Sequence, residues 1–372
     1  MKILIISGFA FPTQNPRAFR TSELAEQLVR FGHDVTVYSP MGNYDYSEYQ
    51  KDTGVLMKDI PSVLTLPRPN SGKGRNVLTK TLWRLCGRFV DIPEVEYAFR
   101  VPPIIRKERG VDLLITVAAP HMIHIGTSKE KTRRPGYFPK VWIADSGDPY
   151  YLNPMHHYPR YMKKYEERWC GECDYITVPT EESKRGYLGE FLDKIAVIPQ
   201  GFDLTKTPVA EYVPGTVPTF AFAGRLYPGQ RDLTSFMDYL IGLKTDYKFK
   251  VITFSPVDPK YTALSGGRIE VIHGIPRKDV IWEISKCDFL VNVTNPDTVQ
   301  TPSKLIDYAI SGRPVLNVSN DFHEQEAFRM FLSGDYSGAV RFAGLEQFSI
   351  ETVASRFLEL FDLAAERKSS SA

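Results

Sequence analysis

The chain alternates between short apolar runs and longer stretches in which apolar residues recur at helical spacing. Apolar runs of this kind are typical of strands buried in a parallel sheet. We predict strands at residues 2–6, 34–38, 111–117, 140–144, 174–178, 195–198, 219–223, 248–254, 268–273, 288–293, 313–318 and 338–342. Helices fill most of the intervals, including 18–31 after the first strand. The alternation predicts an α/β fold with parallel, doubly wound sheets.

A segment rich in proline and glycine divides this pattern in two. It begins at Pro199 and continues to Pro218, and it has the composition of a linker. A chain of 372 residues is long enough for two domains of about 150–200 residues each. We therefore predict two Rossmann-like domains at 1–203 and 204–350, followed by an amphipathic helix at 351–367.

The stretch from Thr301 to Leu316 carries the clearest set of local signals. Thr301 is placed to cap a helix that has Pro302 at its first position. Gly312 is placed to end that helix in the left-handed conformation. Helical spacing predicts a buried side formed by Leu305, Ile306, Ala309 and Ile310.

Two interpretations of this helix start are open. A helix start attracts anions, because its unpaired N–H groups and its dipole both favour negative charge. Lys304 adds a cation to the first turn, and Asp307 could accept hydroxyl hydrogens from a vicinal diol such as a ribose. The same residues are also consistent with an ordinary crossover helix that has a good cap.

The loops after the first-domain strands carry a second set of candidates. The first loop contains Gly8 and Phe9 but lacks the GxGxxG fingerprint, which disfavours a tightly held NAD pyrophosphate. Because α/β sheets bind ligands at the carboxyl ends of their strands, this loop and the nearby Arg20 are candidates to face a ligand. Arg20 is otherwise a solvated helix charge. His121 and Asp148 follow two further strands, and they are either functional residues or caps and turn residues.

Composition and charge exclude several classes of protein. A net charge of +2, from 46 basic and 44 acidic side chains, gives no reason to expect nucleic acid as a partner. The sequence has no signal peptide and no apolar run of about 18 residues, so we expect a cytoplasmic location. Cys170 and Cys173 follow a predicted helix, whereas thiolates are stabilised at helix N-termini. We therefore expect neither a redox pair nor a zinc site there.

Residues 73–89 combine basic and apolar side chains at helical spacing. Leu78, Leu82, Leu85 and Phe89 fall on one helical face. Such a helix lies on an anionic membrane surface, or it packs on a core with its basic side in water. Peripheral contact with the inner membrane face is thus one of two open interpretations.

The motifs together resemble those of GT-B glycosyltransferases of the family-four kind, a largely bacterial group that builds surface polysaccharides. FGHDVTVYS is similar to the family's GHeVtVit strand, and IPQGFD to its IPNGvD at the domain junction. GRLYPGQRD is similar to the GR…K phosphate loop, and PSKLIDYAISGRPVL to the PsKlyEYlAaGrPVl signature. AAPH and ADSGDPY resemble the sPPhs and DfRDPW segments of a capsule-type subgroup. The resemblance covers nearly the whole chain, and it implies that the C-terminal helix returns to the first domain.

The resemblance also implies roles for the candidate residues. Asp148 and His121 would face the reacting sugar as catalytic residues, Arg225 and Arg231 would bind the pyrophosphate, and Asp307 would bind the ribose. The full set expected to contact the nucleotide sugar is Gly8, Phe9, Arg20, Gly224, Arg225, Arg231, Ile275, Gln300, Thr301, Pro302, Ser303, Lys304 and Asp307. We expect no metal, because no acidic pair of the DxD kind lies at a strand end, and no cofactor.

Three places depart from the family pattern. Val299 stands where a carboxylate that touches the donor sugar is expected. Gln230 takes the usual lysine position, with Arg231 one residue later as its substitute. Ser146 and Gly147 replace an aromatic residue and an arginine, so one expected positive charge is missing.

The sequence therefore predicts an enzyme that transfers a hexose from a UDP- or GDP-sugar to a saccharide or lipid-linked saccharide in surface polysaccharide synthesis. Catalysis would come chiefly from neutralising the leaving diphosphate. Two alternatives stay open: a nucleotide-sugar-binding protein with lost or altered catalysis, and a GT-B epimerase that acts on the nucleotide sugar itself.

Overall fold

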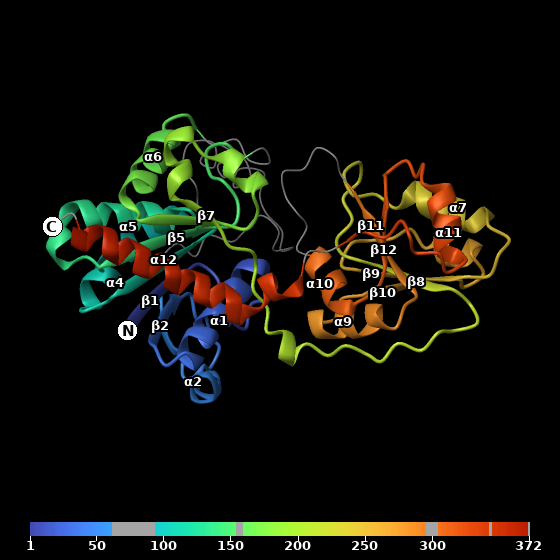
Figure 1. Cartoon of the computed structure of the whole chain (residues 1–372), viewed down its shortest axis with the longest axis horizontal. Coiled ribbons are helices and arrows are strands. Elements are labelled where there is room, and N and C mark those ends of the chain that lie inside the picture. The colour runs from blue at the N-terminus through green and yellow to red at the C-terminus, as the bar shows by residue number, and fades with distance from the viewer. Residues whose placement is uncertain (62–93, 154–158, 295–303, 342–343, 371–372) are drawn as a thin grey trace, which may run out of the picture. The chain divides into compact units, whose positions relative to one another are not determined.

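A computed structural model describes residues 1–61, 94–153, 159–294, 304–341 and 344–370. The chain divides into two compact units, of which the first contains Met1–Phe202 and Gln347–Ala372 and the second contains Asp203–Glu346. Each unit has one parallel sheet interleaved with helices (Figure 1). The predicted α/β fold with two Rossmann-like parts is confirmed.

The first unit is built on a seven-stranded parallel sheet. Its strands are β1 (Lys2–Ser7), β2 (Asp34–Ser39), β3 (Leu56–Asp59), β4 (Leu113–Ala118), β5 (Val141–Ser146), β6 (Tyr175–Val178) and β7 (Ile195–Val197). Its α-helices are α1 (Pro16–Arg30), α2 (Ser47–Thr53), α4 (Tyr97–Lys107), α5 (Met122–Arg133), α6 (Met162–Glu172) and α12 (Ile350–Ser370). Short 3₁₀ helices lie at Glu94–Glu96, Pro135–Tyr137, Glu182–Gly186 and Gly189–Lys194.

The strand order of this sheet creates a switch point between β1 and β4. The order is β3-β2-β1-β4-β5-β6-β7, so the chain builds outward in one direction to β3 and then in the other from β4. Open α/β sheets bind ligands beyond the carboxyl ends of their strands at such a point. The loops that follow β1, β4 and β5 are therefore where a site is expected.

Helix α1 begins two residues before its predicted start, because the sequence contains a cap that the prediction overlooked. The side chain of Asn15 accepts the N–H of Ala18 at 2.8 Å, and Pro16 occupies the first helical position. The helix ends just before Gly32, whose φ of 85° is the left-handed conformation that glycine adopts readily.

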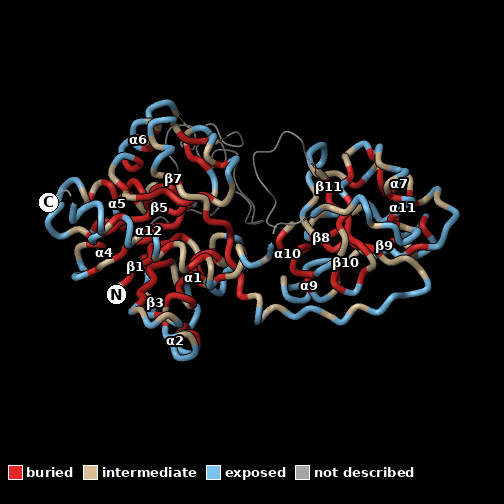
Figure 2. The backbone as a smooth tube through the Cα atoms, in the orientation of Figure 1, coloured by how far each residue is buried: buried red, intermediate tan, exposed pale blue. Residues whose placement is uncertain are grey.

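Both faces of the first sheet are buried. In β1, Ile3 and Ile5 contribute to the core that α1 and α12 share, whereas Leu4 and Ile6 contribute to the core beneath α4, α5 and α6. Figure 2 shows the inner strands of this sheet as buried chain, whereas the outermost strands, β3 and β7, are only partly buried. Burial on both faces is the reason why these strands are apolar at nearly every position.

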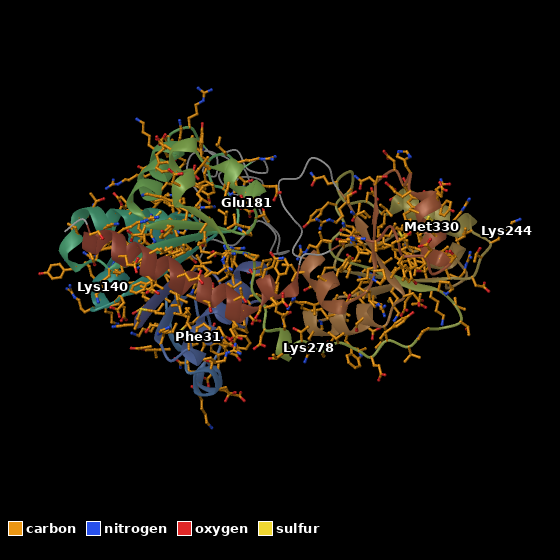
Figure 3. All side chains as sticks on the ribbon, in the orientation of Figure 1. Phe31, Lys140, Glu181, Lys244, Lys278 and Met330 are labelled. Atoms are coloured by element: carbon orange, nitrogen blue, oxygen red, sulfur yellow. The ribbon has the colours of Figure 1, made fainter. Side chains whose placement is uncertain are left out.

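Helix α12 returns to the first unit, as predicted, and lies beside α1 (Figure 1). It buries Ile350, Val353, Ala354, Phe357, Leu360 and Ala364. Phe202, where the chain leaves the unit, forms a parallel bridge with Ser349, where the chain has returned. At the far end of α12, Lys368 donates a hydrogen bond of 2.6 Å to the carbonyl of Lys140, a residue labelled in Figure 3.

The second unit is built on a five-stranded parallel sheet of order β10-β9-β8-β11-β12. Its strands are β8 (Thr219–Ala223), β9 (Lys248–Thr253), β10 (Ile269–His273), β11 (Phe289–Val293) and β12 (Val315–Val318). Its α-helices are α7 (Thr234–Gly242), α8 (Lys260–Leu264), α9 (Arg277–Ser285), α10 (Lys304–Ser311) and α11 (Gln325–Leu332), and a 3₁₀ helix lies at Leu204–Lys206. A further 3₁₀ helix, Leu345–Phe348, spans the boundary with the first unit. Its switch point lies between β8 and β11.

The strand predicted at 338–342 is wrong for its described part. Residues 338–341 form no strand. The N–H of Ala339 instead closes a turn onto the carbonyl of Tyr336 at 3.0 Å, and Val340 donates one backbone hydrogen bond to Val315 at 2.9 Å. An apolar run that touches the sheet at one residue is not distinguished from a strand by its composition.

The cysteine pair lies at the C-terminal end of a helix, as predicted. Cys170 is in the last turn of α6 and Cys173 caps it, and both are buried. Burial raises the pKa of both thiols, that of Cys173 to about 12. Thiols with a raised pKa stay protonated at neutral pH, which makes them poor nucleophiles.

Among the described residues, none of the helices is long and apolar enough to span a bilayer. The basic segment 73–89 lies outside the described residues, so its contact with a membrane stays a prediction.

The packing of α12 generates a stability prediction. Replacing Phe357, which is fully buried in the first-unit core, by alanine should lower the free energy of unfolding by about 3–5 kcal/mol through the cavity it leaves. Leu363→Ala is the matched control, because this side chain of the same helix is 47% exposed. Urea unfolding followed by circular dichroism measures both. Equal midpoints for the two variants would contradict the assignment of α12 to the first-unit core.

Candidate active site

Loops after β1 and β4 meet closely at the first switch point. A Cβ added to Gly8 would lie 2.2 Å from Cδ of Pro120, so only glycine fits there. Ser7, at the end of β1, orders the loop, because its hydroxyl donates to the carbonyl of Phe9 at 2.8 Å and accepts the N–H of the same residue at 3.2 Å. The structure thus brings two of the predicted residues, Gly8 and Phe9, to the carboxyl edge beside the segment that carries His121.

Arg20 has a different role from the predicted one. Its guanidinium contacts both oxygens of Asp145 at 2.8–3.2 Å and donates to the carbonyls of Pro199 at 2.6 Å and Ile198 at 3.2 Å. The side chain is 3% exposed. All three guanidinium nitrogens are used inside the protein, so the expectation that Arg20 binds a nucleotide sugar is wrong. The alternative of a solvated helix charge is wrong as well.

Asp145 is the carboxylate that holds these elements together. It is the fifth residue of β5 and is 2% exposed. Burial opposes its ionisation, but the charges of Arg20 and Arg17 and a 2.7 Å hydrogen bond from Thr177 outweigh burial and lower its pKa. Asp145 is therefore ionised at neutral pH and keeps α1 docked on the sheet.

His121 lies at the start of α5 and is almost fully buried. Its ring stacks on Tyr150 with the centroids 4.7 Å apart. Burial, with the charges of His124 and Arg17, lowers its pKa well below the usual value, so the imidazole is neutral at pH 7. Within the described residues, Nδ1 of His121 has no hydrogen-bond partner, which leaves one ring nitrogen for a ligand.

Asp148 is exposed at the tip of the turn that follows β5. The turn is held from two sides. Glu166 of α6 accepts the N–H groups of Tyr150 at 3.2 Å and Tyr151 at 3.4 Å. On the other side, Pro149 lies so close to Gly186 that a Cβ there would be 2.3 Å from the proline Cβ. The structure therefore brings Asp148, Gly8 and His121 to the ends of neighbouring strands.

In the second unit, the loop after β8 displays two cations. It starts at Gly224, whose φ of 147° suits only glycine. Tyr227 and Arg231 then exchange backbone hydrogen bonds of 2.9 and 2.8 Å, which folds the loop back on itself. Arg225 is exposed, and its guanidinium carbon is 6.0 Å from the ring centroid of Phe254.

Phe254 is a candidate site residue that the sequence analysis missed. It follows β9 immediately, and it is 66% exposed. Ser255 ties its loop to the loop after β8, since its hydroxyl accepts the N–H of Leu226 at 2.9 Å and donates to the carbonyl of the same residue at 3.1 Å. An exposed aromatic ring at a strand end beside an arginine was the available signal, but residue 254 was assigned to the end of the strand.

The predicted ribose ligand Asp307 is paired inside the unit. Its Oδ1 accepts two hydrogen bonds from Arg277, at 2.9 Å from Nε and 2.5 Å from Nη2. Burial raises its pKa, against the opposing charge of Arg277. Because Arg277 follows Ile275 and Pro276, this pair joins α10 to the loop of Ile275, which is predicted to contact the nucleotide sugar. Oδ2 accepts no bond from the described residues, so one oxygen is left for a diol.

Helix α10 is fixed over the ends of two strands by Tyr308. The fully buried hydroxyl accepts the N–H of Ala223 at 2.8 Å and lies 3.1–3.2 Å from the carbonyls of Ala223 and Val291. Burial raises its pKa, and the charge of Arg231 opposes that effect. The predicted buried side of this helix is confirmed for Ile306, Ala309 and Ile310.

The predicted phosphate site begins outside the residues that the structure describes. Gln300, Thr301, Pro302 and Ser303, with Val299, lie outside the described residues, as does the side chain of Lys304. Their contacts with a nucleotide sugar stay predictions. No group of three His, Cys, Asp or Glu side chains suited to a metal ion occurs among the residues that are described.

Two Rossmann-like units in one chain, each with a parallel sheet interleaved with helices, are the architecture of GT-B glycosyltransferases. The Glycosyltransferase Family 4 model matches residues 19–206, slightly more than half of the chain. The chain therefore belongs to Glycosyltransferase Family 4. No curated protein sequence matches it.

Solved structures show the same fold at low sequence identity. A glycosyltransferase from Rickettsia africae is 13% identical, with 97% of this chain and 98% of that chain covered and a TM-score of 0.64. HepE of Anabaena, solved in complex with UDP, is 10% identical over 97% and 100% of the chains, with a TM-score of 0.61. The lipopolysaccharide outer core galactosyltransferase WaaB is 14% identical over 99% and 100%, with a TM-score of 0.57.

The role assigned to Arg20 can be tested by removing its charge. Arg20→Met should lower the free energy of unfolding by about 3–5 kcal/mol, because it strands the buried carboxylate of Asp145. Arg30→Met, in the exposed last turn of the same helix, should change it little. Urea unfolding and UDP titration measure the two properties separately. A variant with normal stability and weakened UDP binding would restore the nucleotide-binding role.

Glu166 generates a pH prediction. Burial raises its pKa to about 7, against the N–H groups of Tyr150 and Tyr151 that lower it. The folded protein therefore holds a proton that the unfolded chain releases, and the stability from this group falls as pH rises from about 4.5 through 7. Glu166→Gln should match the wild type at pH 5 and exceed it by about 1–3 kcal/mol at pH 8. Urea midpoints at both pH values measure this, with the partly exposed Glu167→Gln as control. A pH-independent difference would contradict the assignment.

Proposed function

We propose that this protein transfers a hexose from a nucleoside diphosphate sugar to a saccharide or lipid-linked saccharide, as part of surface polysaccharide synthesis. The observation that carries the proposal is the carboxyl edge of the second sheet. Arg225, Arg231, Phe254 and Asp307 extend there from the loops after β8 and β9 and from α10. Cations, an aromatic face and a carboxylate match the diphosphate, base and ribose of such a donor.

Departure of the diphosphate is the step that these residues support. Charge develops on the leaving phosphate oxygens as the glycosidic bond breaks, and guanidinium groups held on fixed loops stabilise that charge. Arg225 and Arg231 are anchored by the folded-back loop after β8 and by its tie to Ser255, so little reorganisation is needed. The proposal needs no metal ion, because the two guanidinium groups supply the positive charge.

In the first unit, Asp148 and His121 are the proposed partners of the reacting sugar and acceptor hydroxyl. The carboxylate of Asp148 is exposed and positioned by the turn that Glu166 holds. His121 is neutral at pH 7, so it can accept a proton from a hydroxyl or donate a hydrogen bond to an oxygen. Asp148 is proposed as the base or orienting carboxylate of the transfer.

The structure of HepE with UDP favours a uridine nucleotide as the first donor to test, by analogy of fold. The test is a panel of UDP- and GDP-sugars with product detection, run with and without EDTA. Transfer that persists in EDTA supports the proposal. Binding without turnover would favour the nucleotide-sugar-binding alternative, and interconversion of the sugar without acceptor would favour the epimerase.

A pair of variants tests the nucleotide site directly. Arg225→Ala should weaken UDP or GDP binding by about 10- to 100-fold, because a charge-assisted contact with the diphosphate is lost. Lys244→Ala is the matched control, since this exposed lysine follows α7 near the amino-terminal edge of the sheet (Figure 3). Isothermal titration of the full chain measures both. Equal affinities in the two variants would remove Arg225 from the site.

A further inference from the structure

One charged side chain at the first switch point is used neither by the motifs nor by the proposed mechanism. Arg17, the second residue of α1, places its guanidinium against Gly147, in the turn after β5. A Cβ built on Gly147 would lie 2.5 Å from Cζ of Arg17, 2.7 Å from Nη2 and 2.8 Å from Nε. No side chain fits at position 147 while the guanidinium is there. The guanidinium of Arg17 fits here because residue 147 is glycine.

Arg17 is not required to hold Asp145. That carboxylate already receives hydrogen bonds from Arg20 at 2.8–3.2 Å and from Thr177 at 2.7 Å. Arg17 adds one contact of 3.4 Å through Nη1, which is long for a hydrogen bond between charged groups. Its side chain also remains 19% exposed, against 2% for Asp145. The guanidinium thus has donors to spare at a surface.

The surroundings of this guanidinium fit an anion. Arg20 and Thr177 supply most of the hydrogen bonds to Asp145, and the charges of Asp145 and Asp148 both attract Arg17. Nδ1 of His121, which lies near Arg17, is buried and has no partner among the described residues. The helices that begin at Pro16 and Met122 both start at this edge of the sheet, and their dipoles favour negative charge there. Asp148 is the one carboxylate of the group that is exposed.

We propose that Arg17 and His121 bind an oxyanion, a phosphate or carboxylate carried by a substrate, at the carboxyl ends of β1, β4 and β5. The inference rests on the proposed glycosyl transfer, because it names the chemistry of the group that this side of the site recognises. Two sources carry such a group: a charged saccharide acceptor and the diphosphate of the donor. In either case the guanidinium of Arg17, on α1, supplies the positive charge that the family pattern places at position 147, where this chain has glycine.

The geometry also explains why arginine is used. A guanidinium presents two parallel N–H groups to an oxyanion, whereas a lysine ammonium is a point charge on a flexible stem. With the face of its guanidinium against Gly147 and Nη1 toward Asp145, Arg17 has its orientation fixed before a ligand arrives. Arg17→Lys should therefore keep only part of the preference for a charged ligand.

The experiment titrates the full chain with D-glucose 1-phosphate, D-glucuronate, neutral D-glucose and UDP. One expected result is that the wild type binds at least one charged monosaccharide about 10-fold more tightly than D-glucose. The other is that replacing Arg17 weakens UDP binding by a similar factor. Arg17→Met removes the charge and keeps the stem. Gly147→Ala also removes the guanidinium of Arg17 from the proposed site, because the added Cβ displaces it. Arg30→Met, at the other end of α1, is the control.

The outcomes separate the sources. Loss of the preference for charged sugars in both variants, with UDP affinity unchanged, assigns the oxyanion to the acceptor. Loss of UDP affinity assigns it to the donor. The proposal is overturned if the wild type shows no preference for the charged sugars and Arg17→Met binds UDP normally.

Failure of this inference is distinguishable from failure of the proposed function. Normal transfer that depends on Arg225 but not on Arg17 would leave the function and remove the oxyanion site. A wild-type chain that neither binds nor turns over any nucleotide sugar would remove the proposed function, whatever its response to charged monosaccharides.

Discussion

The buried ion pair between Arg20 and Asp145 is the interaction on which the ligand edge of the first unit depends. One guanidinium joins α1 to the end of β5, to the carbonyls of the segment that follows β7, and to α12 through the ring of Phe357, 4.9 Å from its carbon. Both charges are almost fully dehydrated, so each is tolerable only while the other is in place. The pair fixes the direction of the first turn of α1 and with it the position of Arg17.

In the second unit, a neutral hydroxyl rather than an ion pair holds a helix on the sheet. Tyr308 fastens α10 to β8 and β11 through one buried hydroxyl, and Arg277 ties Asp307 to the neighbouring loop. The loop after β8, with the exposed Arg225 and the half-buried Arg231, is therefore held by contacts that do not need a ligand. In both units, buried polar bonds hold the scaffold while exposed side chains at the strand ends remain available. A site built in this way is organised before a substrate arrives.

The sequence was sufficient for the sheets, because strands buried on both faces are apolar at nearly every position. It was also sufficient for α10, where a helical stripe and a closing glycine agree. It was insufficient for Arg20, because the carboxylate that buries it is 125 positions away in the chain and no local pattern records that pairing. Arg17 and Phe254 were missed for related reasons. The place of Arg17 depends on the absence of a side chain at Gly147. The exposure of Phe254 depends on a strand that ends one residue earlier than its apolar run suggests.

The path of the chain through the two units has a consequence for how the protein is made. The second unit, Asp203–Glu346, is inserted between the body of the first unit and the helix that completes its core. During synthesis the second unit is therefore complete before α12 has left the ribosome. Until then the face of the first sheet that α12 covers remains uncovered, and Arg20 lacks the ring of Phe357. The unit that is started first is the one that is finished last.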